Sequence, residues 1–318
     1  MSASRRDFLA GLAAAGLVSQ LPSVALGGVQ PRYLYPPMDL SFFDTPIHHG
    51  PAQIKIGYAA ITWGGNDTQA IQDISALGYP GIQLRANAVQ EYPDPHALRD
   101  LLAKNKLEFV ALSSGTASLD PALRQANIDS HVKNARYLKE AGGKYLQVIG
   151  ASAKNQTYSA QDYTYVGLLL TEIGKRAADY GVQTGFHNHM DTIGEKPDAT
   201  DAILQAADPK YVKLELDTAH YAQGGGDPAA AIRKYSGRLL FLHLKDVKSN
   251  SSKSGYEFTE LGTGRLDFPA IFEALAAVHF RGWGVIELDG ERPGVDRTPK
   301  ESAEISKTYL EQKVGVQV

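Results

Sequence analysis

From Ile54 to its C-terminus the chain alternates short apolar runs with amphipathic stretches, and this alternation constrains the fold more than any other feature. The apolar runs have the length of buried strands, whereas the stretches between them carry apolar residues at helical spacing. We interpret eight runs as strands: 54–61, 81–85, 107–114, 144–150, 182–187, 211–217, 239–246 and 282–288. Strands that alternate with helices indicate a parallel sheet.

The number of units favours a closed barrel over an open sheet. Eight strand–helix units occupy about 265 residues, and a (β/α)8 barrel typically needs roughly 250. A doubly wound open sheet is the alternative, but "ITWGGND" after the first run lacks the G-x-G-x-x-G spacing of a dinucleotide-binding turn. Gly78, Gly142, Gly181 and Gly282 stand where helix C-caps are expected. We therefore predict an α/β fold, a (β/α)8 TIM barrel over residues 53–318.

The N-terminal segment has the composition of an export signal. Arg5 and Arg6 precede an Ala/Gly/Leu-rich run that is too short to span a membrane, and small residues follow at 25–28, where a signal peptidase could cut. We interpret residues 1–27 as a twin-arginine-type signal peptide; a general secretory leader or an uncleaved anchor is the alternative. The prediction is a periplasmic or exported protein, free of the membrane after leader cleavage. Residues 28–52 are proline-rich and aperiodic, and we expect them to form an arm.

Charge and cysteine content exclude some functions. The formal net charge of -3 offers no basic field for a phosphate backbone, so we expect no nucleic-acid partner. The chain has no cysteine, which excludes disulfides, thiolate metal sites and cysteine nucleophiles. Association into a homo-oligomer is left open by the sequence.

The last four strands carry ionisable residues on one face. Side chains two apart on a strand share a face, and the aliphatic face must pack on the helices, so the ionisable face points into the barrel. Active sites of such barrels lie at the C-terminal ends of the strands. The ionisable residues are His187 and His189 on the fifth strand, Lys213, Glu215 and Asp217 on the sixth, His243 and Lys245 on the seventh, and Glu287 on the eighth.

Their convergence predicts a metal site. Burying several ionisable groups together is costly unless they are paired or share a cation. Carboxylate oxygens with one or two imidazoles suit one divalent metal ion, Mn²⁺, Zn²⁺, Co²⁺ or Mg²⁺. Singly, each residue has another interpretation: a histidine can be a core residue, Asp217 a loop cap, Glu287 a partner of Arg292, and Lys213 with Glu215 an ion pair. The joint pattern over four strand ends favours the metal.

Several motifs resemble the xylose isomerase-like barrel superfamily of sugar isomerases, epimerases and dehydratases, which endonuclease IV shares. They are "FHNHMDT", "LELDTAH", "FLHLKD", "GTGRLDF" and "VIELD". The run from "DTAHYAQGGGD" to "FLHLKD" is most similar to inosose dehydratases and their sugar-isomerase-like relatives. The resemblance covers about residues 54–312.

The resemblance implies a single divalent metal held by the ends of strands five to eight. It assigns Asp217, His243 and Glu287 as ligands. The fifth-strand ligand of many relatives is a glutamate, whose place His187 takes here, with His189 as the alternative.

The resemblance also implies chemistry next to a carbonyl, in which a base removes the α-proton and an enediolate forms. Glu287, His189 and His220 are the candidate bases. His220 resembles a substrate-contacting histidine of the family, and Lys245 lies where its "HLKD" motif reaches the substrate. Strand two carries Gln83 where some relatives have a glutamate base.

The implied reaction is an isomerisation, epimerisation, dehydration or lyase cleavage of a small carbohydrate. Export argues against phosphorylated sugars, so we expect an unphosphorylated keto-sugar, inosose or 3-keto-glycoside. The alternatives are a non-catalytic sugar-binding barrel and an endonuclease IV-like metal hydrolase. The hydrolase would need further ligands on strands two and three, which offer Gln83, Arg85, Ser113 and Ser114 instead.

Other residues are candidates for substrate binding. Gln83 and Arg85 share the lumen face of strand two, and Gln147 holds a similar place on strand four. Trp63 could stack on a sugar face or could be a core aromatic. The polar tract 248–267 is a candidate lid.

Overall fold

The computed structural model describes residues 53–152, 157–251, 254–289 and 296–318. The predicted leader and the proline-rich arm lie outside the described residues. Within the described ranges, none of the helices has both the length and the apolar character that crossing a membrane would require.

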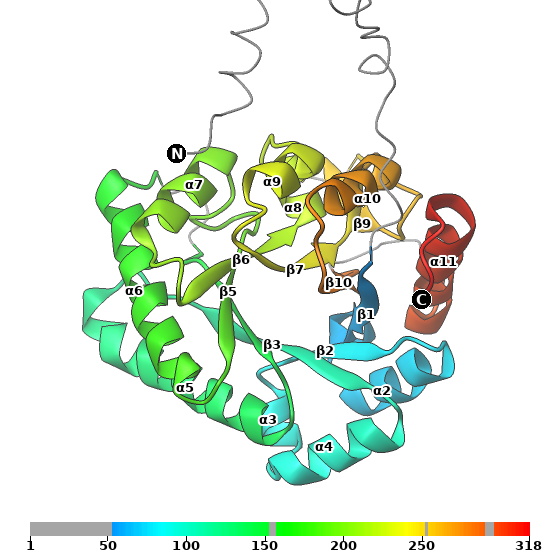
Figure 1. Ribbon diagram of the computed structural model, residues 1–318, viewed down its shortest axis with the longest axis horizontal. Helices are drawn as coiled ribbons and strands as arrows, with labels where there is room; N and C mark the ends of the chain where they lie inside the picture. The colour runs from blue at the N-terminus through cyan, green and yellow to red at the C-terminus, as the bar shows by residue number, and fades with distance from the viewer. Residues whose placement is uncertain (1–52, 153–156, 252–253, 290–295) are drawn as a thin grey trace, which may run out of the picture. The chain divides into compact units, whose positions relative to one another are not determined.

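The strands close into an eight-stranded parallel barrel, as the alternation predicted (Figure 1). Its order around the ring is β1-β10-β7-β6-β5-β4-β3-β2. The barrel strands are β1 (Lys55–Ala59), β2 (Gly81–Arg85), β3 (Glu108–Thr116), β4 (Tyr145–Ile149), β5 (Gln183–His187), β6 (Val212–Asp217), β7 (Leu239–Leu244) and β10 (Trp283–Ile286).

Helices surround the strands on the outside of the barrel (Figure 1). They are α2 (Asp67–Ala76), α3 (Ala88–Glu91), α4 (Pro95–Lys104), α5 (Arg124–Glu140), α6 (Ala160–Ala178), α7 (Pro197–Ala206), α8 (Thr218–Gln223), α9 (Pro228–Lys234), α10 (Phe268–Ala277) and α11 (Pro299–Tyr309), with the short turns η3 (Ala60–Trp63), η4 (Pro121–Leu123) and η5 (Leu310–Val314). The sequence marks several starts: Asp94, Asp227 and Asp267 cap α4, α9 and α10, each with a proline in the first turn.

Three of the four predicted glycine caps are confirmed. Gly78, Gly142 and Gly181 take the left-handed conformation that ends a helix. Gly282 does not. His279 adopts the positive φ of 54° after α10, and Gly282 instead directly precedes β10, where a Cβ would lie 2.8 Å from the Phe280 ring.

The lower part of the lumen is apolar. Phe241, Trp283 and Val285 pack there with small residues of the neighbouring strands, and Tyr145 stacks on Phe241 with ring centroids 5.4 Å apart. Each of these strands continues toward its C-terminal end with polar residues on the same face, so the apolar layer forms a floor beneath the site.

A hairpin that the sequence did not predict begins at Asp246, inside the predicted seventh strand, and continues into the candidate lid tract. Strands β8 (Asp246–Ser249) and β9 (Tyr256–Thr259) pair in antiparallel fashion. The buried Asp246 carboxylate accepts hydrogen bonds from the backbone N–H groups of Val247, Gly262, Gly264 and Leu266. Asp246, the last residue of the "FLHLKD" motif, therefore holds the backbone of the "GTGRLDF" motif in place and fixes the loop after β7.

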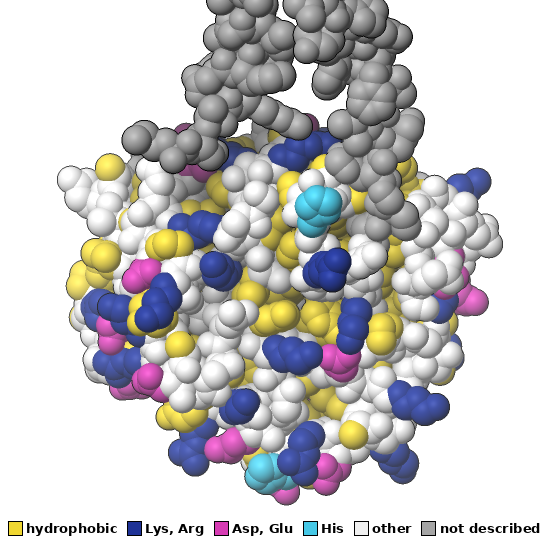
Figure 2. Space-filling view, in the orientation of Figure 1, with side chains coloured by type: hydrophobic (Ala, Val, Ile, Leu, Met, Phe, Trp, Pro, Cys, Tyr) yellow, Lys and Arg dark blue, Asp and Glu magenta, His cyan; other side chains and the backbone are white. Residues whose placement is uncertain are grey.

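Charged side chains on the face seen in Figure 2 are interspersed with apolar and uncharged ones rather than gathered into one continuous patch. This agrees with the near-neutral composition, a formal net charge of -3.

Candidate functional site

Four of the predicted residues meet at the C-terminal mouth of the barrel. His187 ends β5, Asp217 ends β6, His243 lies near the end of β7, and Glu287 follows β10. Asp217 and His243 are register partners on adjacent parallel strands. All four side chains are buried, with Glu287 the most exposed at 7%.

The distances between these side chains fit a shared cation. His243 Nδ1 lies 3.6 Å from Asp217 Oδ2 and 3.3 Å from Glu287 Oε2. One donor atom each from His187, Asp217 and His243 lies within 4.8 Å of the others. His187 Nδ1, Asp217 Oδ2 and His243 Nδ1 are buried without a hydrogen-bond partner among the described residues. Buried polar atoms are rarely left so, and a divalent ion would satisfy all three.

Asp217 is both a helix cap and a candidate metal ligand. Its Oδ1 accepts the His220 backbone N–H at 2.8 Å and caps α8, which leaves Oδ2 for the cluster. Asn188, between the two histidines of "HNH", hydrogen-bonds the backbone of Asp217 in both directions. Asn188 thus joins β5 to β6 and holds their ends together.

The other nitrogen of His243 faces away from this cluster. His243 Nε2 lies 2.8 Å from both Gln83 Oε1 and Glu215 Oε1. Gln83 in turn donates from its amide nitrogen to Gln147 Oε1. Burial lowers the pKa of His243, but the Glu215 and Glu287 carboxylates outweigh it and raise the pKa well above the usual range in the metal-free structure. With a metal bound, Nε2 would keep its proton and the Nδ1 lone pair would bind the ion. Gln83, which was predicted to bind substrate, is therefore also bonded to a predicted ligand, and Gln147 is bonded to Gln83.

Glu215 is a site residue whose role the sequence prediction missed. The predicted ion pair with Lys213 is wrong: Glu215 Oε1 lies 2.8 Å from His243 Nε2 and 3.5 Å from His187 Nδ1. Burial raises the pKa of Glu215 to about 7, although His243 acts in the opposite direction. The "ELD" spacing of two was a signal for it, since Glu215 shares the lumen face with Asp217.

Lys245 is fully buried among acidic partners. Its Nζ lies 2.6 Å from Asp289 Oδ1 and 2.8 Å from Glu287 Oε2, and 4.2 Å from the ring centre of Phe258 in β9. Burial alone would lower the pKa of Lys245, but the carboxylates, Asp289 foremost, raise it. Glu287 is thus paired with Lys245 and His243, whereas Arg292 lies outside the described residues.

Asp289 and Phe258 were not predicted as site residues. Asp289 follows Glu287 by two positions, so the same alternation could have indicated it. Phe258 lies on the unpredicted hairpin, where its ring also contacts that of His220, with centroids 4.9 Å apart.

The remaining histidines lie beside this cluster. The rings of His189 and His220 are 3.8 Å apart between centroids. One nitrogen each of His187, His189 and His220 lies within 4.8 Å of the others. His189 is grouped in this way with His187 and His220 but not with Asp217 or His243, which favours His187 as the fifth-strand ligand. Burial lowers the pKa of His187 and of His220 well below the usual range.

A small cavity of about 50 Å³ opens at the mouth. It is lined by Ala59, Ile61, Gln83, Arg85, Ser113, Gln147, Ile149, His187, His189, Glu287 and Asp289. This volume is well below that of typical ligand pockets, roughly 300–1,000 Å³, so a sugar would need side chains or loops at the mouth to move. Arg85 contributes a buried Nε that has no partner among the described residues.

Trp63 and Ser114 do not line the cavity. The Trp63 indole lies in the hydrophobic core, 8% exposed, where it donates to Asp73 Oδ2 at 2.9 Å and packs edge-on against Tyr58. This position matches the interpretation of Trp63 as a core aromatic and not as a residue that stacks on a sugar. Ser114 turns outward and hydrogen-bonds His131 at 2.7 Å.

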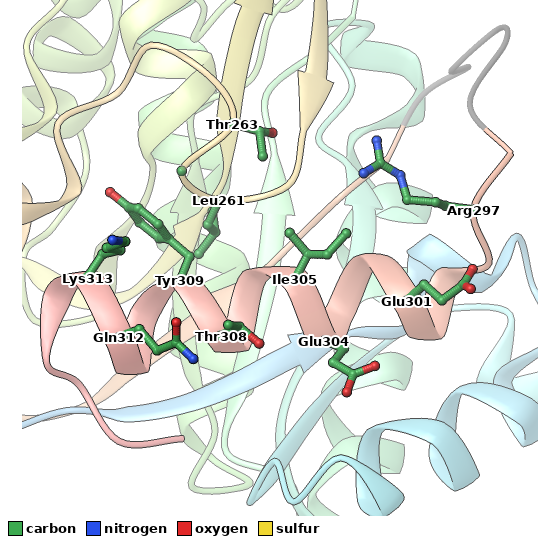
Figure 3. Close-up of a pocket in the computed structure, with 11 residues that line it drawn as sticks. Leu261, Thr263, Arg297, Glu301, Glu304, Ile305, Thr308, Tyr309, Gln312 and Lys313 are labelled. Carbon is green, nitrogen blue, oxygen red and sulfur yellow. The ribbon is translucent and has the colours of Figure 1, made fainter.

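A second, open pocket lies between α11 and residues 261–263 (Figure 3). It shares no lining residue with the mouth cavity. Its side chains include Arg297, Glu301, Tyr309 and Lys313, and none of the candidate catalytic residues is among them.

Comparison with known proteins agrees with the barrel fold. A family model described as "Xylose isomerase-like TIM barrel" matches residues 71–312. The rhizopine catabolism protein MocC of Rhizobium meliloti is 26% identical over 274 residues, 74% of this chain and 82% of that protein. An inosose dehydratase of Lactiplantibacillus plantarum is 26% identical over 299 residues, 81% of this chain and 96% of that protein. The solved structure of the IolI protein with a bound zinc atom superposes with a TM-score of 0.70 at 18% identity, over 82% of this chain and 98% of that chain.

Proposed function

Because the chain belongs to the xylose isomerase-like TIM barrel family, we propose that it is a divalent-metal-dependent enzyme that removes the proton next to a sugar carbonyl. Its substrate would be an unphosphorylated keto-sugar, inosose or 3-keto-glycoside. The main support is that the buried ligand atoms of His187, Asp217 and His243 at the barrel mouth have no hydrogen-bond partner among the described residues. Similarity to a dehydratase that acts on an inosose points to the same class of substrate.

His187, Asp217, His243 and Glu287 would hold the ion. Two imidazoles and two carboxylates suit Zn²⁺, Co²⁺ or Mn²⁺, with Mg²⁺ less well matched to imidazole. The bound ion would supply positive charge that stabilises the enediolate oxygens. Gln83 and Glu215 would hold the His243 ring in the orientation that exposes Nδ1.

The chain's own residues would bind and protonate the substrate. Lys245, kept protonated by Asp289 and Glu287, would donate a hydrogen bond or a proton to a substrate oxygen. Arg85 and Gln147 would bind hydroxyl groups from the opposite wall of the cavity. Phe258 covers the Lys245 ammonium and would help to exclude water from it.

The fate of the abstracted proton would determine the reaction type. Its return to another face or carbon gives an epimer or isomer, whereas loss of a β-substituent gives dehydration or glycoside cleavage. Because each of these outcomes can follow from the same enediolate, the reaction is to be identified by product analysis.

The test is proton exchange in D₂O. Purified protein loaded with Zn²⁺, Co²⁺ or Mn²⁺ is incubated with a panel of inososes, ketohexoses and 3-keto-glucosides, and deuterium uptake and products are followed by NMR and mass spectrometry. We expect exchange with at least one substrate and its loss after EDTA treatment. Stoichiometric metal with no exchange would indicate a sugar-binding barrel, and cleavage of abasic DNA would indicate a metal hydrolase.

We also propose that the protein is exported through the twin-arginine pathway, on the basis of Arg5, Arg6 and the short apolar run that follows. N-terminal sequencing of the protein from a periplasmic fraction would test this. We expect a mature N-terminus near residue 28, and replacement of both arginines by lysine should keep the precursor in the cytoplasm.

A further inference from the structure

The three candidate bases named from the sequence, Glu287, His220 and His189, differ in whether a lone pair is free. Glu287 is engaged. Its Oε2 lies 2.8 Å from Lys245 Nζ and 3.3 Å from His243 Nδ1, and it is also a proposed metal ligand. A carboxylate that already satisfies two cationic or metal-binding groups is a poor proton acceptor.

The one lone pair of a neutral His220 ring is also engaged. The Met190 backbone N–H donates to Nδ1 at 3.2 Å, and Lys245 Nζ lies 3.2 Å from Nε2. A hydrogen-bond donor thus faces each nitrogen of a fully buried ring. His220 therefore has no free lone pair for the substrate proton.

His189 is hydrogen-bonded in the opposite way to His220, because its Nδ1 faces an acceptor instead of a donor. Its Nδ1 lies 2.6 Å from the Met190 carbonyl oxygen, an acceptor that requires a proton on Nδ1. A neutral imidazole carries one ring proton, so the lone pair is on Nε2. His189 is half-buried and lines the mouth cavity. The two peptide groups of Met190 thus hold adjacent histidines in opposite ways, because its N–H donates to His220 and its carbonyl accepts from His189.

The turn after Met190 is braced in the position that this contact needs. Asp191 adopts a left-handed φ of 59°, a conformation that few non-glycine residues take. Its N–H donates to Glu195 Oε2 at 2.9 Å, and its carbonyl accepts from Ser152 Oγ at 3.1 Å. Backbone strain that neighbouring contacts maintain is typical of functional sites.

We propose that His189 is the general base of the proposed reaction, with its Nε2 lone pair directed to the substrate by the Met190 carbonyl. This inference rests on the function proposed above. In the step, the substrate C–H bond next to the carbonyl breaks and an Nε2–H bond forms. The electron pair of the C–H bond moves onto the carbonyl oxygen and leaves an enediolate, and the imidazolium then returns its proton to carbon or to a departing oxygen.

The tautomer can be measured without any substrate. Zn²⁺-loaded protein labelled with ¹⁵N in its histidine rings is studied at pH 8 by two-bond ¹H–¹⁵N correlation spectra, and His189→Gln identifies the His189 signals. We expect a protonated Nδ1 and an unprotonated Nε2. An Nε2–H tautomer or a doubly protonated ring would overturn the proposal. This result holds or fails independently of whether the substrate class is right.

Matched variants separate a base from a ligand and from a structural residue. His189→Gln should reduce deuterium exchange by about 10²–10⁴-fold and leave Zn²⁺ affinity within about threefold. His220→Gln, which removes the stacked ring, should lose less exchange. An equal or greater loss in His220→Gln, full exchange in His189→Gln, or a tenfold weaker Zn²⁺ affinity in His189→Gln would each overturn the assignment. Partial recovery of His189→Ala by added imidazole would support it, because a structural defect is not rescued in this way.

Discussion

Replacing Glu215 by glutamine should affect the metal-free and the metal-loaded protein in opposite directions. Glu215 is fully buried, and both its oxygens lack a well-formed hydrogen bond among the described residues. Its nearest charged neighbour is His243, with Oε1 and Nε2 2.8 Å apart. Burial nevertheless raises the pKa of Glu215 from 4.5 to about 7, so the ionised carboxylate is unfavourable there until a cation binds.

The sign and size of the effect follow from this pKa. Between pH 4.5 and 7 the folded, metal-stripped protein keeps a proton that the unfolded chain has lost, so its stability falls as pH rises. A pKa raised from 4.5 to about 7 corresponds to roughly 3 kcal/mol of lost stability above pH 7. Glu215→Gln removes this loss, so the metal-stripped variant should be more stable than the parent by roughly 3 kcal/mol at pH 8 and similar near pH 4.5.

In the metal-loaded protein, Glu215→Gln should be unfavourable, because it should weaken metal binding. Glutamine removes the negative charge beside Nε2–H of His243, and loss of such a partner typically weakens metal affinity by roughly 10–100-fold. Urea unfolding of chelator-treated protein from pH 4.5 to 8, together with Zn²⁺ competition titrations, measures both effects. The control is Glu273→Gln, at an exposed position on α10, which should change neither. An unchanged pH slope, or Zn²⁺ bound as tightly as by the parent, would refute the reasoning.

Three further outcomes test other parts of the structure. Trp63→Phe removes the hydrogen bond to Asp73 and should cost about 1 kcal/mol of stability while leaving KM unchanged; a large rise in KM would place Trp63 at the substrate instead. Gly264→Ala puts a Cβ 2.2 Å from Asp246 Oδ1 and should destabilise by roughly 1–3 kcal/mol, measured by urea unfolding, whereas Gly237→Ala, which meets nothing within 4 Å, should be near neutral. Removal of metal by EDTA should lower stability at pH 8 by about 2.7 kcal/mol relative to protein in free metal at 100 times its Kd, and an unchanged unfolding midpoint would argue against a resident ion.

The sequence alone determined the barrel and the side of it that carries chemistry. Both results come from local periodicity: apolar runs alternating with helical patterns predict parallel strands, and a spacing of two places His187, Asp217, His243 and Glu287 on the lumen face. Strand ends in a barrel meet at one mouth, so their convergence was predictable without knowing any distance.

Only the tertiary structure decided which groups are partners. Glu215 lies against His243 on the next strand rather than Lys213 on its own, Gln83 bonds Gln147 two strands away, and η3 turns Trp63 into the core. Phe258 contacts Lys245 from the β8–β9 hairpin, which the pattern of apolar residues in the sequence did not predict. The physical reason is that hydrogen bonds and ion pairs depend on ångström-scale distances between segments remote in sequence, and barrel closure and loop conformation set those distances.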